Sequence, residues 1–191
     1  MVNKIDRELI NPIDNIINDV VDKNLETYHK LNLTPNHLTT IGLVFALLGI
    51  YLFYKDYYVI GAVLFFIAYY FDCADGKYAR KYNMTSKYGS LYDSFSDIFK
   101  FVLLFAVMYK KSFKKLKLII LPMIILTLLH DLYMQCTEKI YNKHESEAFK
   151  YVLFSDVSNM NCNEKLKYLK YFGSATLILF ISLVMVFWPK L

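Results

Sequence analysis

The sequence predicts an all-α, polytopic transmembrane helical bundle. Hydrophobic residues make up 56% of the 191 residues, and the mean hydropathy is +0.30. Several apolar runs approach the ~20 residues that a helix needs to cross the hydrocarbon core of a bilayer. A soluble helical bundle is the alternative, but a soluble domain of this length rarely carries so many long apolar runs.

The first 33 residues are polar and charged. Asn11-Pro12 has the pattern of an N-cap followed by proline at the first helical position. Apolar residues then recur on one helical face, so we expect an amphipathic helix that lies in the membrane interface or caps the bundle. No cleavable signal peptide is indicated. We therefore divide the chain into an N-terminal amphipathic juxtamembrane segment, residues 1–33, and a single transmembrane domain, residues 34–191.

Five apolar runs indicate five clear membrane spans, which are residues 38–54, 57–71, 98–109, 116–129 and 172–188. The second helix should continue through polar residues to about Arg80, and residues 81–88 should form a polar loop. Within the polar stretch 137–164, the segment 148–154 is too short to span, and we expect it to be interfacial or re-entrant. The three cysteines are far apart, and their spacing indicates neither a disulfide framework nor a zinc site.

Four aspartates lie on two neighbouring segments of helical character. Asp72 and Asp75 are three residues apart, and Asp93 and Asp97 are four apart. At this spacing each pair lies on one face of its helix. Four carboxylates in an apolar setting require compensating charge, and a pair of hard divalent cations would supply it. Two such ions can hold the attacking and leaving oxygens of a phosphoryl transfer.

Small residues and one arginine share these helix faces. Gly76, Ala79 and Gly89 would let a substrate or a second helix come close. Arg80 follows one turn later, and its guanidinium is suited to a phosphate. Each residue alone has an ordinary explanation, such as packing or a snorkelling cation, so the joint spacing carries the interpretation. A cation transporter also carries buried acidic residues, but it would leave these four residues unexplained.

The pattern D-x2-D-G-x2-A-R-x8-G-x3-D-x3-D, from Asp72 to Asp97, resembles the signature of the CDP-alcohol phosphotransferases, membrane enzymes of phospholipid synthesis. Residues 34–39 also resemble the entry to the first span in that family, and the resemblance covers roughly residues 34–110. It implies six spans, transfer of a phosphoryl-linked group from a CDP-linked donor to an alcohol, release of CMP, and two Mg²⁺ or Mn²⁺ ions.

The resemblance also implies roles for individual residues. Asp72, Asp75, Asp93 and Asp97 would be metal ligands, and Asp97 would also be the general base. The residues implied in binding CDP are Asn36, Thr39, Asp72, Gly76, Ala79, Arg80 and Gly89. Family members often form homodimers through their spans, so a homodimer is expected in addition to the substrates and membrane lipid.

Two positions bear on the substrate. Family members that make phosphatidylinositol or phosphatidylglycerophosphate usually carry a basic residue directly after the final aspartate, where this chain has Ile98, and an arginine in the first span, where it has Ile41-Gly42-Leu43. These differences favour the branch that joins CDP-choline or CDP-ethanolamine to diacylglycerol. The alternative is a CDP-diacylglycerol donor with inositol, inositol phosphate, serine or glycerol phosphate as acceptor. His130 and Asp131 are weaker candidates for the acceptor pocket.

CDP-linked donors are made in the cytosol, so we expect a multi-pass membrane protein whose aspartates open to the cytosol. If it is expressed in a eukaryotic cell, we expect it in the ER or another internal membrane. Basic residues around the loop 81–88 agree with the positive-inside rule, whereas the run 110–117 then lies on the opposite side, against it. The sequons at Asn32 and Asn83 should therefore stay unmodified. A net charge of +5 is compatible with contact to anionic lipid headgroups. The charge is too small, and spread over too many segments, to indicate nucleic-acid binding.

Overall fold

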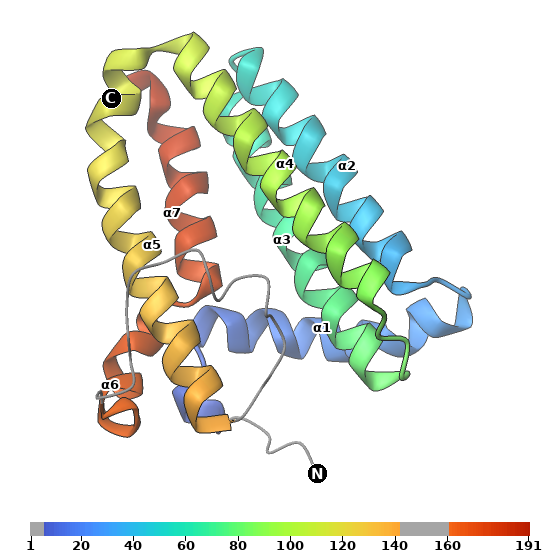
Figure 1. The fold of residues 1–191 in the computed structure, drawn as a ribbon. Coiled ribbons are helices and arrows are strands. Elements are labelled where there is room, and N and C mark those ends of the chain that lie inside the picture. The colour runs from blue at the N-terminus through green and yellow to red at the C-terminus, as the bar shows by residue number, and fades with distance from the viewer. Residues whose placement is uncertain (1–5, 142–160) are drawn as a thin grey trace. The chain divides into compact units, whose positions relative to one another are not determined.

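A computed structural model describes residues 6–141 and 161–191, and within these ranges the chain forms helices, turns and connecting loops without any strand (Figure 1). The seven α-helices of the described part are α1 (Pro12–Lys30), α2 (Pro35–Tyr54), α3 (Tyr58–Lys81), α4 (Lys87–Lys111), α5 (Phe113–Tyr141), α6 (Cys162–Leu169) and α7 (Ser174–Phe187). Short 3₁₀ turns cover Arg7–Leu9, Lys170–Phe172 and Trp188–Lys190. The expected all-α fold is confirmed.

Four helical segments of the described part are long and apolar enough to cross a membrane: Pro35–Tyr54, Tyr58–Lys81, Phe113–Ile140 and Cys162–Lys190. The remaining expected span, residues 98–109, is the C-terminal part of α4. That helix has 25 residues, but Asp93, Asp97 and Lys100 make its N-terminal half too polar for an uninterrupted apolar span. The expected interfacial or re-entrant segment 148–154 lies outside the described residues.

Helix starts follow local capping chemistry. Asn11 accepts hydrogen bonds from the backbone N–H groups of Ile13 and Asp14, at 2.9 and 3.4 Å, so α1 begins at Pro12 as predicted. Thr34 and His37 exchange side-chain to backbone hydrogen bonds in a capping box that starts α2. Because the caps satisfy N–H groups that have no partner inside the helix, they fix where each helix enters the bundle.

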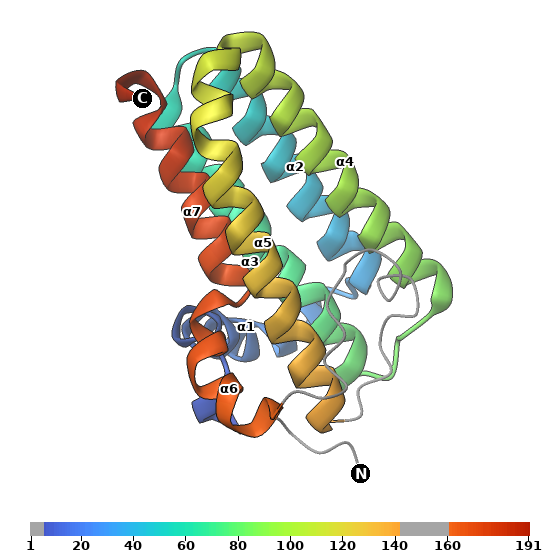
Figure 2. The same cartoon turned by 60° about the vertical axis from the view of Figure 1, so that its left-hand side comes forward.

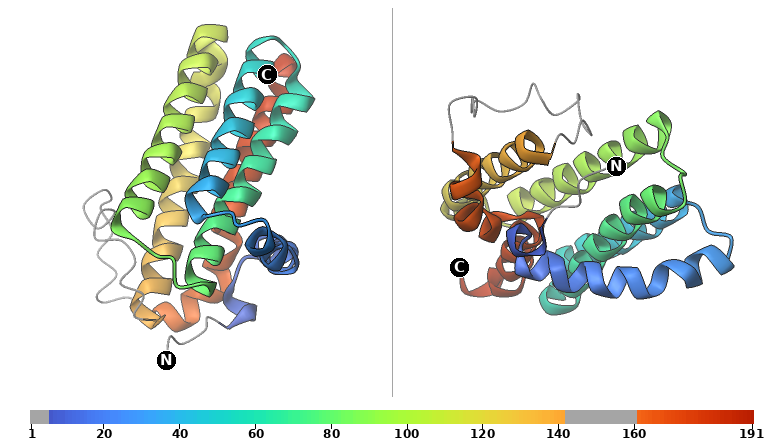
Figure 3. Two further views of the ribbon diagram at one scale, coloured as in Figure 1. Left: turned by 90° about the vertical axis from the view of Figure 1, so that its right-hand side faces the viewer. Right: turned by 90° about the horizontal axis from the view of Figure 1, so that it is seen from below.

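The described residues divide into two compact units, one formed by Met1–Asn15 with Ile120–Leu177 and the other by Ile16–Ile119 with Ile178–Leu191. In the second unit, α2, α3 and α4 lie side by side, with neighbours running in opposite directions (Figures 1 and 3). The most extensive helix contact there is between α2 and α3.

Two glycines allow the close approach of α2 and α3. A Cβ placed on Gly49 would lie 2.7 Å from the carbonyl oxygen of Gly61, and a Cβ on Gly61 would lie 2.7 Å from the carbonyl oxygen of Gly49. Real side-chain atoms do not pack so tightly, so both positions require glycine at this crossing. Phe53 is fully buried nearby, and the Trp188 ring meets it edge-on at a centroid distance of 5.5 Å.

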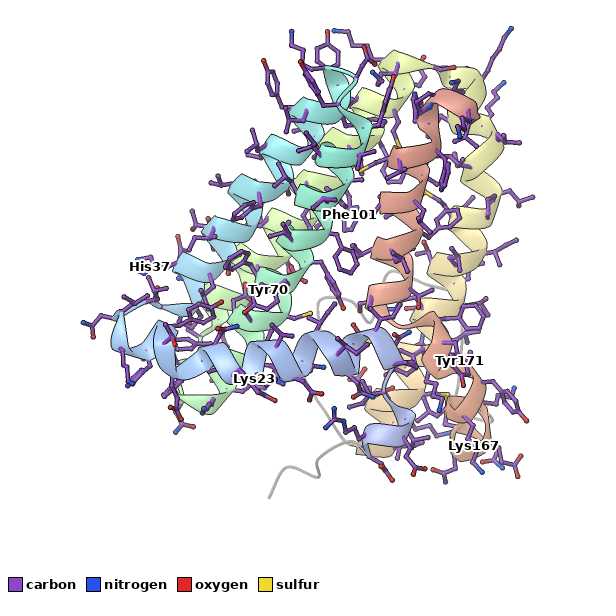
Figure 4. The ribbon with its side chains drawn as sticks, turned by 180° about the vertical axis from the view of Figure 1, so that it is seen from behind. Lys23, His37, Tyr70, Phe101, Lys167 and Tyr171 are labelled. Atoms are coloured by element: carbon purple, nitrogen blue, oxygen red, sulfur yellow. A yellow bond between two sulfur atoms is a disulfide. The ribbon has the colours of Figure 1, made fainter. Side chains whose placement is uncertain are left out.

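Helix α1 runs crosswise to α2 and α3, beside the C-terminal half of α3 (Figure 3). It buries an apolar face formed by Ile17, Val21 and Leu25, which confirms its amphipathic character. On its polar side, Tyr70 of α3 accepts a hydrogen bond from Asn24 at 2.9 Å and shares another with the Tyr28 hydroxyl at 2.8 Å (Figure 4). Its position in the membrane interface stays a prediction.

In the first unit, α6 packs beside the C-terminal end of α5 (Figure 2). Cys136 and Cys162 form a disulfide with a Cα–Cα distance of 5.2 Å, and both are buried together with Tyr133 and Leu166. The cysteine spacing did not indicate this disulfide. Their separation of 26 residues carries no sign of proximity, because the contact depends on the chain returning to α5.

Candidate functional site

Three helices of the second unit contribute to the site that contains the spaced aspartates, glycines and arginine singled out in the sequence. The C-terminal half of α3, the N-terminal half of α4 and the start of α2 contribute to it. Thr40 of α2 shares a hydrogen bond of 2.9 Å with the Tyr92 hydroxyl of α4. A Cβ on Gly89 would lie 3.2 Å from Asn36 Oδ1, so the start of α2 lies against the first turn of α4.

Three of the four predicted aspartates converge. Asp72, Asp93 and Asp97 each offer a carboxylate oxygen, and these oxygens lie within 4.8 Å of one another. Asp75 lies one turn further along α3, is only 5% exposed, and accepts a hydrogen bond from the Thr39 hydroxyl. Thr39 therefore contacts Asp75, and Asp75 is not part of the three-carboxylate cluster.

Lys100 enters the same cluster, although the sequence patterns did not single it out. Its side chain is only 9% exposed, and its Nζ lies 3.1 Å from Asp72 Oδ1 and 2.5 Å from Asp97 Oδ1. Both contacts are ion pairs, and Lys100 also donates a hydrogen bond to Asp72. The sequence signal was its position three residues after Asp97, which places both residues on one helix face.

The cluster has the donor set of a hard divalent cation. Asp93 Oδ1 is buried and has no hydrogen-bond partner among the described residues. A buried carboxylate oxygen without a partner is costly, and coordination would satisfy it. Carboxylate oxygens are also the ligands that Mg²⁺ and Mn²⁺ prefer. Asp72, Asp93 and Asp97 therefore fit such an ion.

Three of the predicted nucleotide-binding residues, Gly76, Ala79 and Arg80, follow the aspartates of α3 towards the loop between α3 and α4. Arg80 is exposed, and its guanidinium folds back over Gly76, since a Cβ there would lie 3.3 Å from Arg80 Nη1. Ala79 is half-buried beside it. The guanidinium thus covers the surface of Gly76 in this structure.

Two further positions explain sequence features. A Cβ on Gly42 would lie 3.1 Å from Phe71 Cβ and 3.2 Å from the carbonyl oxygen of Ala68, so any larger residue there would require α3 to shift by a few tenths of an ångström. His130 and Asp131, the weaker candidates for the acceptor pocket, make local contacts in the first unit. His130 Nδ1 lies 3.1 Å from the Phe172 carbonyl oxygen, and Asp131 accepts a hydrogen bond of 2.6 Å from Gln135.

Comparisons with known proteins agree with this geometry. Residues 32–189 match the family described as CDP-alcohol phosphatidyltransferase. Archaetidylinositol phosphate synthase from Pyrococcus horikoshii is 34% identical over 64 residues, which cover 34% of this chain and 34% of that protein. The aligned part thus spans about a third of the length of this curated relative. No solved structure matches the chain.

Proposed function

The chain belongs to the CDP-alcohol phosphatidyltransferase family, and from this premise we propose that it transfers a phosphoryl-linked group from a CDP-linked donor to an alcohol hydroxyl, with release of CMP. The observation that supports this best is the convergence of Asp72 from α3 with Asp93 and Asp97 from α4. The match over residues 32–189 includes this cluster, so the family assignment and the geometry concern the same residues.

In the proposed reaction, the acceptor oxygen attacks the donor phosphorus that carries the transferred alcohol. The bond from this phosphorus to the bridging oxygen of CMP breaks, and CMP leaves with the bonding electrons. The hydroxyl proton passes to a carboxylate oxygen of Asp97, which is the proposed general base. Two bound Mg²⁺ or Mn²⁺ ions, held by Asp72, Asp75, Asp93 and Asp97, would neutralise charge on the diphosphate.

The other residues of the site would position the donor. The hydrogen bond from Thr39 fixes the Asp75 carboxylate, and Asn36 beside Gly89 would contact the nucleotide. Arg80 would bind a phosphate through its guanidinium. Gly76, Ala79 and Gly89 leave space on the helix faces for the cytidine part, so the proposed specificity for CDP depends on small residues as well as on charge.

For the substrates, we propose a CDP-diacylglycerol type of donor with a small polar acceptor as the first candidate. The name of the relative from Pyrococcus horikoshii favours this alternative. The preference for the choline and ethanolamine branch rested partly on the absence of a basic residue at Ile98. The Ile98 side chain is 58% exposed, whereas Lys100, two residues later, places a cation in the aspartate cluster. The absence of a basic residue at position 98 therefore does not leave the cluster without one. CDP-choline or CDP-ethanolamine with diacylglycerol is the second candidate.

We further propose that residues 34–191 act as one catalytic domain, with the N-terminal helix at the membrane interface and a homodimer as the assembled form. Because CDP-linked donors are made in the cytosol, the cluster would open to that side, in an internal membrane of a eukaryotic host. Glycan attachment at Asn83, detected as a mass shift removed by an endoglycosidase, would contradict this orientation.

The test is CMP release by purified protein with Mg²⁺ or Mn²⁺, offered each donor class with its acceptors. Asp97→Asn should lower kcat by at least ~10²-fold, because the amide cannot accept the hydroxyl proton. Asp56→Asn, at an exposed aspartate outside the cluster, is the matched control and should keep full activity. Absence of CMP release with every donor and acceptor pair would refute the proposed reaction.

A further inference from the structure

Lys100 joins two helices through carboxylates that are also candidate metal ligands. Its Nζ is 3.1 Å from Asp72 Oδ1 on α3 and 2.5 Å from Asp97 Oδ1 on α4. The residue is only 7% exposed although it lies in an otherwise apolar stretch of α4. In this arrangement the ammonium holds the two carboxylates together, which is the effect that a bridging cation would have.

The ammonium and a divalent ion would need the same oxygens. Asp72, Asp93 and Asp97 each place a carboxylate oxygen where one metal ion could bind all three. A coordinated Mg²⁺ would lie only ~2.1 Å from each oxygen that it binds. A cavity of about 10 Å³ next to Lys100, lined also by Thr39, Asp72 and Asp97, has room for about one water. Two cations this close in a partly buried site repel each other strongly.

We propose that Lys100 is a built-in cation that competes with a divalent ion for the oxygens of Asp72 and Asp97. The proposal rests on the proposed function, because it concerns the metal ligands of the same site. In the metal-free protein Lys100 keeps the carboxylates together, and binding of an ion between Asp72 and Asp97 requires the ammonium to leave. Lys100 therefore weakens binding of one ion and sets the metal concentration at which the cluster fills.

A purely structural ion pair makes a different prediction. If Lys100 only tied α3 to α4, its removal would loosen the cluster and weaken metal binding. Competition predicts the opposite sign, because removal of the charge leaves the carboxylates free for the ion. The sign of the change in affinity therefore separates the two roles without any measurement of catalysis.

The experiment is a titration of purified, metal-free protein with Mn²⁺ in detergent, in which the EPR signal of free Mn²⁺ reports binding without nucleotide. Lys100→Met, which keeps the length of the side chain without the charge, should bind the more weakly held ion at least ~10-fold more tightly than the wild type. Lys100→Gln should behave in the same way. Lys110→Met, at an exposed lysine of the same helix, is the matched control and should bind as the wild type does.

The same variants should show a second signature in thermal unfolding. Lys100→Met should unfold at a lower temperature than the wild type without metal, and Mn²⁺ should raise its Tm by more than it raises that of the wild type, because a tighter ligand stabilises the folded state more. Folded Lys100→Met and Lys100→Gln that bind Mn²⁺ as the wild type does, or more weakly, would overturn the proposal.

A measurement on the wild type keeps the test independent of how the variants fold. Saturating Mn²⁺ should increase acylation of Lys100 by an amine-reactive reagent, quantified by mass spectrometry, because the ion displaces the ammonium from its carboxylates. Unchanged acylation at saturating Mn²⁺ would also overturn the proposal. Absence of Mn²⁺ binding in every variant would instead refute the metal ligands of the proposed function.

Discussion

The close crossing of α2 and α3 gives a prediction that does not depend on catalysis. In Gly61→Ala the new methyl group would lie 2.7 Å from the carbonyl oxygen of Gly49 and 2.9 Å from the backbone nitrogen of Phe53. Both neighbours are backbone atoms, so the helices must move apart. Overpacking of this kind costs up to about 3 kcal/mol. Alanine is better than glycine in a helix by about 1 kcal/mol. The expected net loss of stability is thus up to about 2 kcal/mol.

The assay is unfolding of the purified protein in mixed micelles with increasing SDS, followed by circular dichroism. Gly76→Ala is the matched control, because it makes the same change on the same helix but meets only the Arg80 guanidinium, at 3.3 Å. This flexible side chain can move, so Gly76→Ala should be as stable as the wild type or more stable. If Gly61→Ala were equally stable, the reasoning about the close crossing would be refuted.

Three further predictions concern other parts of the molecule. Reduction of the Cys136–Cys162 disulfide, which closes a loop of 26 residues, should lower stability by about 3 kcal/mol, measured as a drop in Tm on addition of a reductant; an unchanged Tm would contradict it. The Lys111 ammonium lowers the pKa of Asp56, so this carboxylate stabilises the fold above its unfolded pKa of about 3.9 and loses that effect as the pH falls towards the lowered value. Tm measured from pH 6 to pH 3 should therefore fall less in Asp56→Asn, and parallel curves would count against the pairing. Arg80→Lys keeps the charge but loses the two-pronged contact to phosphate, so the KM for the CDP-linked donor should rise by about tenfold, with kcat much less affected; an unchanged KM would remove Arg80 from donor binding.

The helices and the two aspartate pairs could be predicted because they depend on local periodicity. The helix of the second predicted span, which was expected to continue through polar residues to about Arg80, is α3, and it ends at Lys81. Spacing also placed the carboxylates on shared helix faces, but it could not say which oxygens converge. That depends on the rotation of α3 against α4, which is why Asp75 faces Thr39 while the cluster forms from the other three.

Two features depended on tertiary contacts that the sequence pattern does not encode. Lys100 is one charged residue in an apolar run, and its contact with Asp72 exists only because the fold brings α4 within side-chain reach of α3. The Cys136–Cys162 disulfide requires α6 to return to the end of α5. Neither the helical period nor the cysteine spacing indicates contacts between different helices. Only the contact of Lys100 with Asp97 could have been predicted, because the two residues are three apart on one helix.

The pairing of Asp97 with Lys100 within one helix also bears on how the protein is made. Charged groups are expensive in a bilayer, and α4 is too polar to count among the four apolar spans of the described part of the chain. Because both partners are on α4, a neutral pair can form as soon as this helix does, before α3 or any metal is in place. A helix that carries its own counterion would enter lipid at a lower cost than a helix with the same two charges unpaired.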